Sequence, residues 1–253
     1  MNKNILFVLE GEKAEARFMQ KLISIFIKDV HPAFFHYKTN IHHMIDGMMS
    51  DDGVIDADLD FIEYLKSYDI NREDKSILNH KFTDIFLFFD MDPQNQKYDA
   101  KDMQTILNYF SDPSDNGKLY LNYPMLESYK HVSDLNNLSF LDTKVKREDI
   151  RRYKSIVDTE ALPNLKDLSK ITEDVWERLL ALNVIKANII CNDIGDIPSM
   201  EQYENTIAQD TIFEIQSKHL EEDGFLFVMN TSLFYIVDYR GESILSKLSL
   251  LAF

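Results

Sequence analysis

Three short apolar runs, each ended by polar residues, constrain the fold of this chain most strongly. The runs are Asn4–Leu9, Asp84–Phe89 and Lys118–Tyr123. A continuous apolar run of this length is typical of a strand that is buried on both faces of a parallel sheet. Helical patterns follow the first two runs, over Lys13–Lys28 and Asp99–Phe110. The alternation predicts an α/β fold with a mainly parallel sheet flanked by helices.

The second half of the chain differs from the first, because helical patterns predominate after about residue 135. We predict a further strand at Ala33–Lys38, a short strand at Gly224–Met229, and helices at Asp56–Ser67, Ile150–Val157, Leu165–Ala187, Ser199–His219 and Thr231–Leu251. The chain of 253 residues, 45% of them hydrophobic, is long enough for a large core. We expect one α/β domain over residues 1–134 and a mainly helical region over residues 135–253.

Charge and cysteine content narrow the class of protein. Cys191 is the only cysteine, so no intrachain disulfide can form, which suits a reducing compartment. No apolar run approaches the ~18 residues that suggest a membrane span, and the one near the N-terminus is too short for a signal peptide. We therefore expect a cytoplasmic protein. A net charge of −16 is unusual for a protein that binds a nucleic-acid backbone unaided.

Acidic residues follow two of the predicted strands directly. Glu10 ends the first run, and Asp90 and Asp92 end the second. Ligands of parallel sheets bind at the carboxyl ends of the strands, so we expect these side chains to share one crevice. Carboxylates about 4 Å apart repel by roughly 4 kcal/mol per pair, unless a divalent cation lies between them. Mg²⁺, or Mn²⁺, suits oxygen ligands of this kind, and such sites serve phosphoryl or phosphodiester transfer.

Three segments resemble the sequence blocks of Toprim-domain proteins, and most closely those of the RloB-like and OLD-like bacterial nuclease group. They are LFVLEGEKAEARF (6–18), FLFFDMDP (86–93) and NYPMLESYKH (122–131). The resemblance covers roughly residues 4–131. Leu9 stands where the group often has Cys, and Met125-Leu126 replaces a small residue followed by an aromatic one.

The resemblance implies a Mg²⁺-dependent endonuclease that cleaves phosphodiester bonds in DNA or RNA. On it, Glu10 is a metal ligand and general acid/base, and Asp90 and Asp92 are metal-binding and catalytic. Glu15 matches a further metal-binding position, and Glu127 a further catalytic one. Nucleases of this group often act in bacterial anti-phage defence with an ABC-type ATPase, so the resemblance also implies a protein partner. The sequence leaves DNA versus RNA open, and also the oligomeric state, a homo-oligomer included.

One basic cluster follows the third block. It consists of Lys144, Lys146, Arg147, Arg151, Arg152 and Lys154. On a helix, Arg147, Arg151 and Lys154 would line one face. The cluster is either a solvated helix face or a contact for the phosphate backbone beside the acidic site.

Each acidic residue also has an ordinary structural explanation. Glu10 could stabilise the N-terminus of the following helix, and Asp90 and Asp92 could form a turn before a proline. Glu15 and Glu127 could be solvated residues near helix starts.

The histidines give weaker signals. His131 is either a structural residue or a proton-transfer group beside Glu127. His42 and His43 lack partners at zinc-binding spacing, and we expect both at the surface.

Two rival functions remain open from the sequence. A Toprim-like module without activity would only bind a protein partner. A metal-dependent phosphatase would use the aspartate pair, although Asp90 and Asp92 come late in the chain for that class.

Overall fold

The computed structural model describes residues 3–28, 30–56, 58–68 and 75–253. The strands are β1 (Lys3–Leu9), β2 (Val30–His36), β3 (Asp84–Asp90), β4 (Ser111–Asp112), β5 (Gly117–Asn122), β6 (Lys144–Lys146) and β7 (Phe225–Phe227). The α-helices are α1 (Ala14–Phe26), α2 (Ile41–Met48), α3 (Phe61–Ser67), α5 (Ala100–Tyr109), α6 (Tyr153–Glu160), α7 (Glu173–Asn192), α8 (Met200–Thr206), α9 (Gln209–Lys218), α10 (Phe234–Arg240) and α11 (Glu242–Leu248). Single-turn 3₁₀ segments are η1 (Ser76–Asn79), η2 (Leu126–Lys130), η3 (Ser139–Asp142), η4 (Arg147–Arg152), η5 (Pro163–Leu165), η6 (Leu168–Lys170) and η8 (Thr231–Leu233), and η7 (His219–Asp223) is a π-helical turn.

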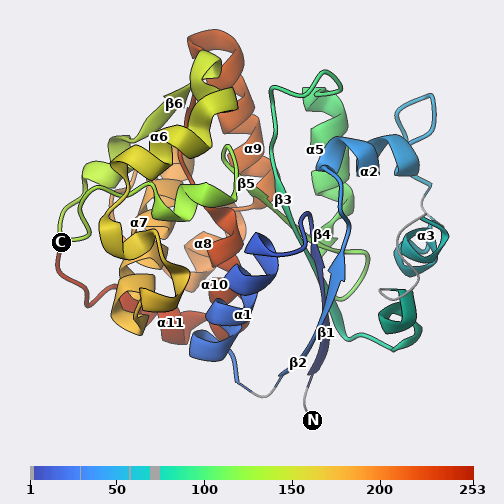
Figure 1. Ribbon diagram of the computed structural model, residues 1–253, viewed down its shortest axis with the longest axis horizontal. Coiled ribbons are helices and arrows are strands. Elements are labelled where there is room, and N and C mark those ends of the chain that lie inside the picture. The colour runs from blue at the N-terminus through green and yellow to red at the C-terminus, as the bar shows by residue number, and fades with distance from the viewer. Residues whose placement is uncertain (1–2, 29, 57, 69–74) are drawn as a thin grey trace.

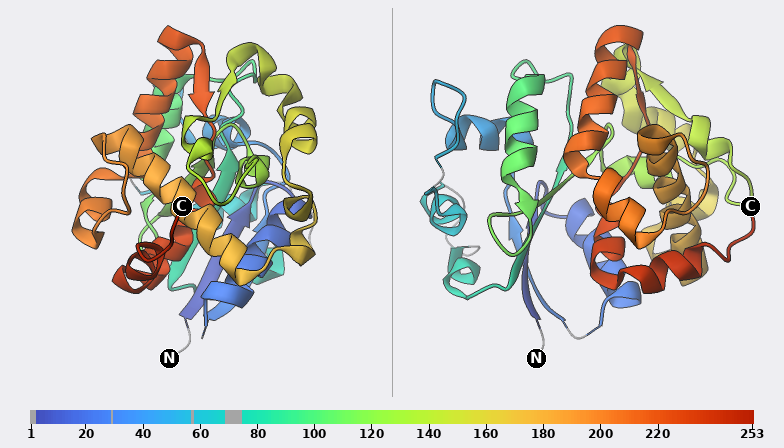
Figure 2. Two further views of the ribbon diagram at one scale, coloured as in Figure 1. Left: turned by 90° about the vertical axis from the view of Figure 1, so that its left-hand side faces the viewer. Right: turned by 180° about the vertical axis from the view of Figure 1, so that it is seen from behind.

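The central sheet has five strands in the order β2-β1-β3-β5-β4. All neighbouring pairs are parallel except β4 with β5, which is antiparallel at the edge. Helices cover both faces: α1, α10 and the other C-terminal helices lie on one side, and α2, α3 and α5 on the other (Figures 1 and 2). The predicted α/β class with a mainly parallel, helix-flanked sheet is confirmed. Because β1, β3 and β5 run in the same direction, the residues that follow them meet at one edge.

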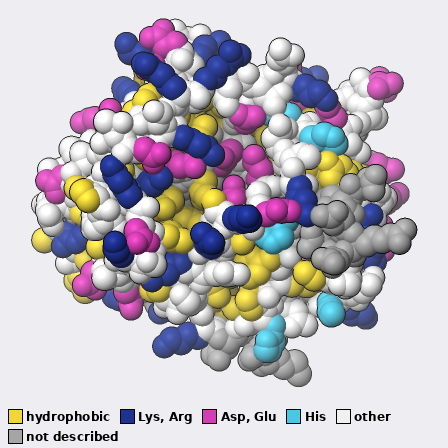
Figure 3. All heavy atoms as spheres, in the orientation of Figure 1, with side chains coloured by type: hydrophobic (Ala, Val, Ile, Leu, Met, Phe, Trp, Pro, Cys, Tyr) yellow, Lys and Arg dark blue, Asp and Glu magenta, His cyan; other side chains and the backbone are white. Residues whose placement is uncertain are grey.

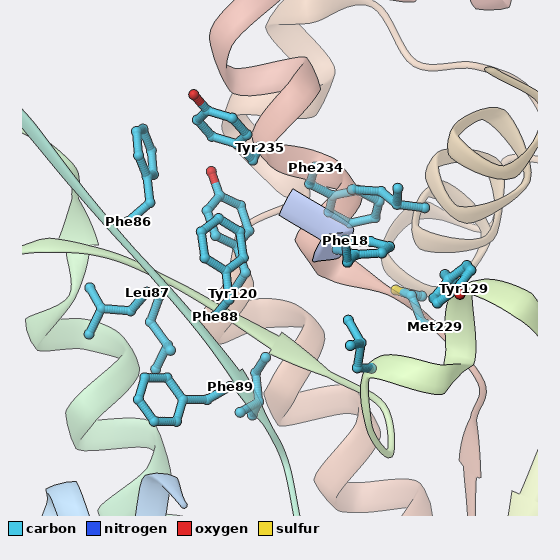
Figure 4. Close-up of a cluster of buried hydrophobic side chains, with 14 of the residues drawn as sticks. Phe18, Phe86, Leu87, Phe88, Phe89, Tyr120, Tyr129, Met229, Phe234 and Tyr235 are labelled. Carbon is cyan, nitrogen blue, oxygen red and sulfur yellow. The ribbon is translucent and has the colours of Figure 1, made fainter. Parts of the chain in front are cut away.

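The strands are buried on both faces, as the apolar runs predict. Residues Ile5–Leu9 are each 0% exposed. On one face, the ring of Tyr235 in α10 packs edge-on against Phe7 and Phe86, with centroids 5.3 and 4.7 Å apart. Phe89 points to the opposite face, where it contacts Tyr37 (Figure 4). The hydrophobic rings therefore fix the sheet between its two helical layers.

Residues from both halves of the chain contribute to one hydrophobic core. A buried polar seam joins the segment after β5 to residues 230–232. Asn230 donates from its side chain to the carbonyl of Leu126 (2.9 Å), and its backbone N–H donates to the side chain of Asn183 (2.7 Å). Ser232 donates to the side-chain oxygen of Asn122 (2.9 Å), at the end of β5. The C-terminal half thus positions the strand end beside the expected acidic site.

Several element boundaries differ from the predicted ones for local physical reasons. The helix expected from residue 56 starts at 61, because the Asp60 side chain accepts the backbone N–H of Glu63 and caps it there. The helix expected over 231–251 is divided at Gly241, whose φ of 57° is incompatible with a continuous helix. Helix α2 was not predicted. Among the described residues, no helix is long and apolar enough to cross a membrane.

We expect Asn183→Leu to lower the free energy of unfolding by about 1–3 kcal/mol, because the buried N–H of Asn230 loses its acceptor. Urea unfolding measures this as a lower midpoint with an unchanged slope. Asn164→Leu, at an exposed position, is the control. Equal midpoints for the two variants would show that the seam contributes no net stability.

Candidate active site

Glu10 and Asp90 are brought together by the parallel pairing of β1 with β3. Glu10 directly follows β1, and its Oε2 accepts a hydrogen bond from the backbone N–H of Asp90 (2.9 Å). Burial raises the pKa of Glu10 from 4.5 to about 8. The Asp90 N–H opposes this shift, whereas the charges of Glu15 and Asp92 add to it. Glu10 is therefore a carboxyl that holds its proton to near-neutral pH in the absence of a cation.

Asp90 is the last residue of β3 and faces the seam. Its Oδ1 accepts hydrogen bonds from the backbone N–H of Leu126 (2.8 Å) and from the side chain of Asn122 (3.4 Å). Burial, followed by repulsion from Glu10 and Glu127, raises its pKa well above the usual range. Asn122 lies next to the end of the third apolar run, so its place near the strand ends was available from the sequence, but its role in holding Asp90 was not recognised.

Asp92 lies in a tight turn with a φ of 47°, a left-handed conformation that Asp tolerates better than most residues. Its carboxylate accepts from the side chains of Gln94 and Asn95. Its carbonyl accepts from Nε2 of His42 (3.1 Å). His42 is only 1% exposed, so the prediction of a surface position is wrong for this residue. Burial lowers the pKa of His42, which favours the neutral form with its proton on Nε2.

Glu15 and Glu127 both lie near the strand ends. Glu15 is in the first turn of α1, and its carboxylate folds over the backbone of Gly11. A Cβ atom at residue 11 would lie 2.5 Å from Oε2 of Glu15, so a larger residue there would displace this carboxylate. Glu127, in η2, forms an ion pair through Oε1 with Lys154 (3.2 Å). Its Oε2 is buried without a hydrogen-bond partner.

A cleft of about 910 Å³ opens over this acidic group. Its carboxylates are Glu10, Glu12, Glu15, Asp90 and Asp92, and its cations are Lys13, Lys38, Arg151, Arg152 and Lys154. The lining is thus balanced, whereas the whole chain carries −16. Figure 3 shows acidic side chains near the centre of this face with Lys and Arg side chains beside them. Burial disfavours the charge of Lys154, but the carboxylates of Glu127, Asp90 and Glu15 outweigh it and raise its pKa.

The basic cluster is divided between two places. Arg151, Arg152 and Lys154 line the cleft. Arg147 donates to the carbonyl of Leu220 (2.6 Å), and Lys144 lies over the ring of Phe225 (4.2 Å). Lys146 is exposed at the end of β6.

The cluster does not lie on one helix, and the helix expected at Ile150–Val157 coincides only in part with α6. Residues 144–146 form a strand, residues 147–152 a 3₁₀ turn, and α6 begins only at Tyr153. The pairing of β6 with β7 causes the difference. Arg147, Arg151 and Lys154 therefore do not form one helical stripe.

The carboxylates suit a hard cation by chemistry, since they offer only oxygen ligands. Their arrangement does not by itself form a metal site. Among the described residues, no three His, Cys, Asp or Glu side chains form a group that could hold a metal. Protein donors occupy the carboxylates instead, as the bonds from Asp90 N–H to Glu10 and from Leu126 N–H to Asp90 show. Mg²⁺ commonly takes only one or two carboxylates together with water and substrate phosphates. Carboxylates of this number would suit Mg²⁺ only where water and substrate phosphate supply the remaining ligands.

The buried state of Glu10 gives a pH prediction for the metal-free protein. Its folded pKa of about 8 exceeds the unfolded value of 4.5, so the folded state binds more protons between these values. The free energy of unfolding should fall as pH rises through this window, with a slope of at most about 1.4 kcal/mol per pH unit from this group. Unfolding of wild type and Glu10→Gln in EDTA measures the difference. Parallel pH profiles would contradict the raised pKa.

In comparisons with known proteins, no family model, curated protein or solved structure matches this chain. The similarity to Toprim proteins consequently rests on the three short sequence blocks alone. What the cleft does must be inferred from its own residues.

Proposed function

We propose that this protein is a divalent-cation-dependent nuclease that hydrolyses phosphodiester bonds in DNA or RNA. One observation carries the proposal: two half-buried carboxyl groups, Glu10 and Asp90, meet at the ends of adjacent parallel strands. The cleft around them is lined by five carboxylates and five cations in all. Carboxylates that repel one another beside lysine and arginine suit a ligand made of metal and phosphate together. The likeness of the three sequence blocks to Toprim nucleases supports the same reading.

In this proposal, Glu10 and Asp90 would hold Mg²⁺ or Mn²⁺ together with water and substrate phosphate, and Asp92 and Glu15 would lie close by. The bound cation would orient the phosphate and stabilise the charge that develops on it. Glu10 or Glu127 exchanges the proton of the attacking water, and the raised pKa of Glu10 suits it to this role. Arg151 and Lys154 bind the phosphate oxygens from the opposite side of the cleft. Asn122 and His42 position the aspartates and touch no substrate.

The charge outside the cleft indicates a partner. At −16, the chain repels a polyanion at long range, so association with nucleic acid is slow unless a basic surface assists. We propose a protein partner, an ABC-type ATPase, that supplies this surface in the bacterial cytoplasm as part of anti-phage defence. The Toprim resemblance supports this choice of partner.

We expect Glu10→Gln and Asp90→Asn each to reduce cleavage by about a hundredfold or more, because the loss of a general acid/base alone costs about 10²–10⁴. Plasmid DNA, tRNA and a phosphate monoester are incubated with the protein, alone and with an ABC-type ATPase encoded beside it, in Mg²⁺, Mn²⁺ or EDTA. Gel analysis and phosphate release measure the products.

Glu63→Gln is the matched control, because Glu63 lies on α3 with a side chain that is 64% exposed. It should retain full activity. Turnover of the monoester alone would instead indicate a phosphatase. Absence of cleavage under all these conditions would favour a module that only binds a partner, and would contradict the nuclease proposal.

Metal binding is testable without activity. Free Mg²⁺ at a hundred times its Kd should stabilise the fold by about 2.7 kcal/mol, which raises Tm by roughly 5–10 °C for a chain of this size. In EDTA, Asp90→Asn should melt at or above the wild-type Tm, because a buried repulsion is removed. Calorimetry in EDTA and in Mg²⁺ makes the comparison. An equal Mg²⁺ shift in wild type and Asp90→Asn would exclude Asp90 as a ligand.

A further inference from the structure

A second groove, of about 740 Å³, adjoins the acidic cleft across η2 and the start of α1. Met125 lines the cleft, whereas the next residues, Leu126 and Glu127, line the groove. On α1, Glu15 faces the cleft and Arg17 faces the groove. The two hollows therefore share a wall, and an extended ligand that crosses it would lie in both.

The groove is basic although the chain is strongly acidic. Its cations are Arg17, Lys21, Lys130 and Lys166, against the two carboxylates Glu127 and Asp167. These cations come from separate segments of the sequence, so no linear cluster reveals them. Figure 3 shows hydrophobic side chains on this face with Lys and Arg side chains around them.

Two of the four cations have no partner among the residues that the structure describes. Arg17 and Lys21 lie one turn apart on α1, and neither side chain forms a hydrogen bond or ion pair with any described residue. Lys130 pairs with Asp158 (3.1 Å), and Lys166 donates to the carbonyl of the same residue. Arg17 and Lys21 are thus the cations that a bound anion would meet first.

The floor of the groove is apolar, but little of its aromatic part is open: Phe18 is 1% exposed and Tyr129 8%, whereas Ala14 and Leu168 are more accessible. Phe18 and Tyr129 contact each other with ring centroids 5.0 Å apart, and both rest on Trp176 at 5.5 Å. Leu126 and Leu168 extend this floor. An apolar floor beneath a cationic rim fits a ligand with an anionic backbone and flat apolar groups, since an anion alone would gain nothing from the floor.

We propose that this groove binds a single-stranded flank of the nucleic-acid substrate whose scissile phosphate lies in the acidic cleft. The inference rests on the proposed function and deepens it by naming the substrate form. Arg17 and Lys21 contact successive phosphates, and unpaired bases or sugars lie on the floor. A duplex keeps its bases stacked inside, so it would reach the cations but not the floor.

The test measures binding in EDTA, where cleavage plays no part. The full chain is titrated into fluorescein-labelled oligothymidylate and oligouridylate of about twelve nucleotides, and into a duplex of the same length, over a range of salt. Arg17→Gln/Lys21→Gln should weaken single-strand binding about tenfold or more near 0.1 M salt. The slope of log K against log salt should fall by about 1.4, at about 0.7 per lost phosphate contact.

Lys101→Gln/Lys218→Gln removes the same charge from exposed positions on α5 and α9 that line neither hollow. It should leave both the affinity and the slope unchanged within about twofold. The proposal is overturned if the control weakens binding equally, if the groove variant binds like wild type, if duplex binds as tightly as single strand, or if wild type binds no oligonucleotide.

Failure here is separable from failure of the nuclease proposal. Selective single-strand binding through Arg17 and Lys21 without cleavage in Mg²⁺ would refute only the nuclease. Cleavage lost in Glu10→Gln, with normal binding in Arg17→Gln/Lys21→Gln, would refute only the groove.

Discussion

The parallel pairing of β1 with β3 forces Glu10 and Asp90 into the same half-buried space, and much of the surrounding structure compensates for this proximity. The backbone N–H of Asp90 donates a hydrogen bond to the carboxylate of Glu10, and the backbone N–H of Leu126 donates one to the carboxylate of Asp90. Lys154 lies on α6, in the C-terminal half of the chain, and forms an ion pair with Glu127. These contacts replace part of the hydration that both carboxylates lose, but they leave both pKa values raised. The raised pKa values mean that charging both carboxyls together is unfavourable in this space, a cost that a bound cation would reduce.

The parts of the fold that could be predicted are those that depend on local pattern. Apolar runs fix where β1, β3 and β5 lie, and a parallel sheet then places Glu10 and Asp90 at one edge. The turn at Asp92 was predictable from the proline that follows it. The conformation of that turn was not, because it depends on His42, and α2 carries that residue from fifty positions earlier in the chain. The division of the basic cluster was unpredictable for a similar reason, since residues 144–146 pair with β7 about eighty residues away.

The distribution of charge was likewise predictable only where it depends on neighbouring residues in the sequence. The total of −16 predicted poor binding of polyanions, and the linear cluster at 144–154 was the one visible exception. Folding removes Lys144 and Arg147 from that cluster and brings Lys13 and Lys38 into the cleft instead. It also gathers Arg17, Lys21, Lys130 and Lys166 around an apolar floor. The net charge therefore describes the electrostatic field far from the protein, whereas the charge inside each of the two hollows depends on the residues that line it.

The buried seam at residues 230–232 has a consequence for how the polypeptide matures. Asn122 holds Asp90, yet Asn122 itself is bonded to Ser232, near the end of the chain. Residues 230–232 are synthesised after every acidic residue of the site, so Asn122 lacks the hydrogen bond from Ser232 until they have left the ribosome. A polypeptide truncated before them would carry all of the acidic residues and could still pair β1 with β3, but Asn122, which bonds Asp90, would be held less firmly.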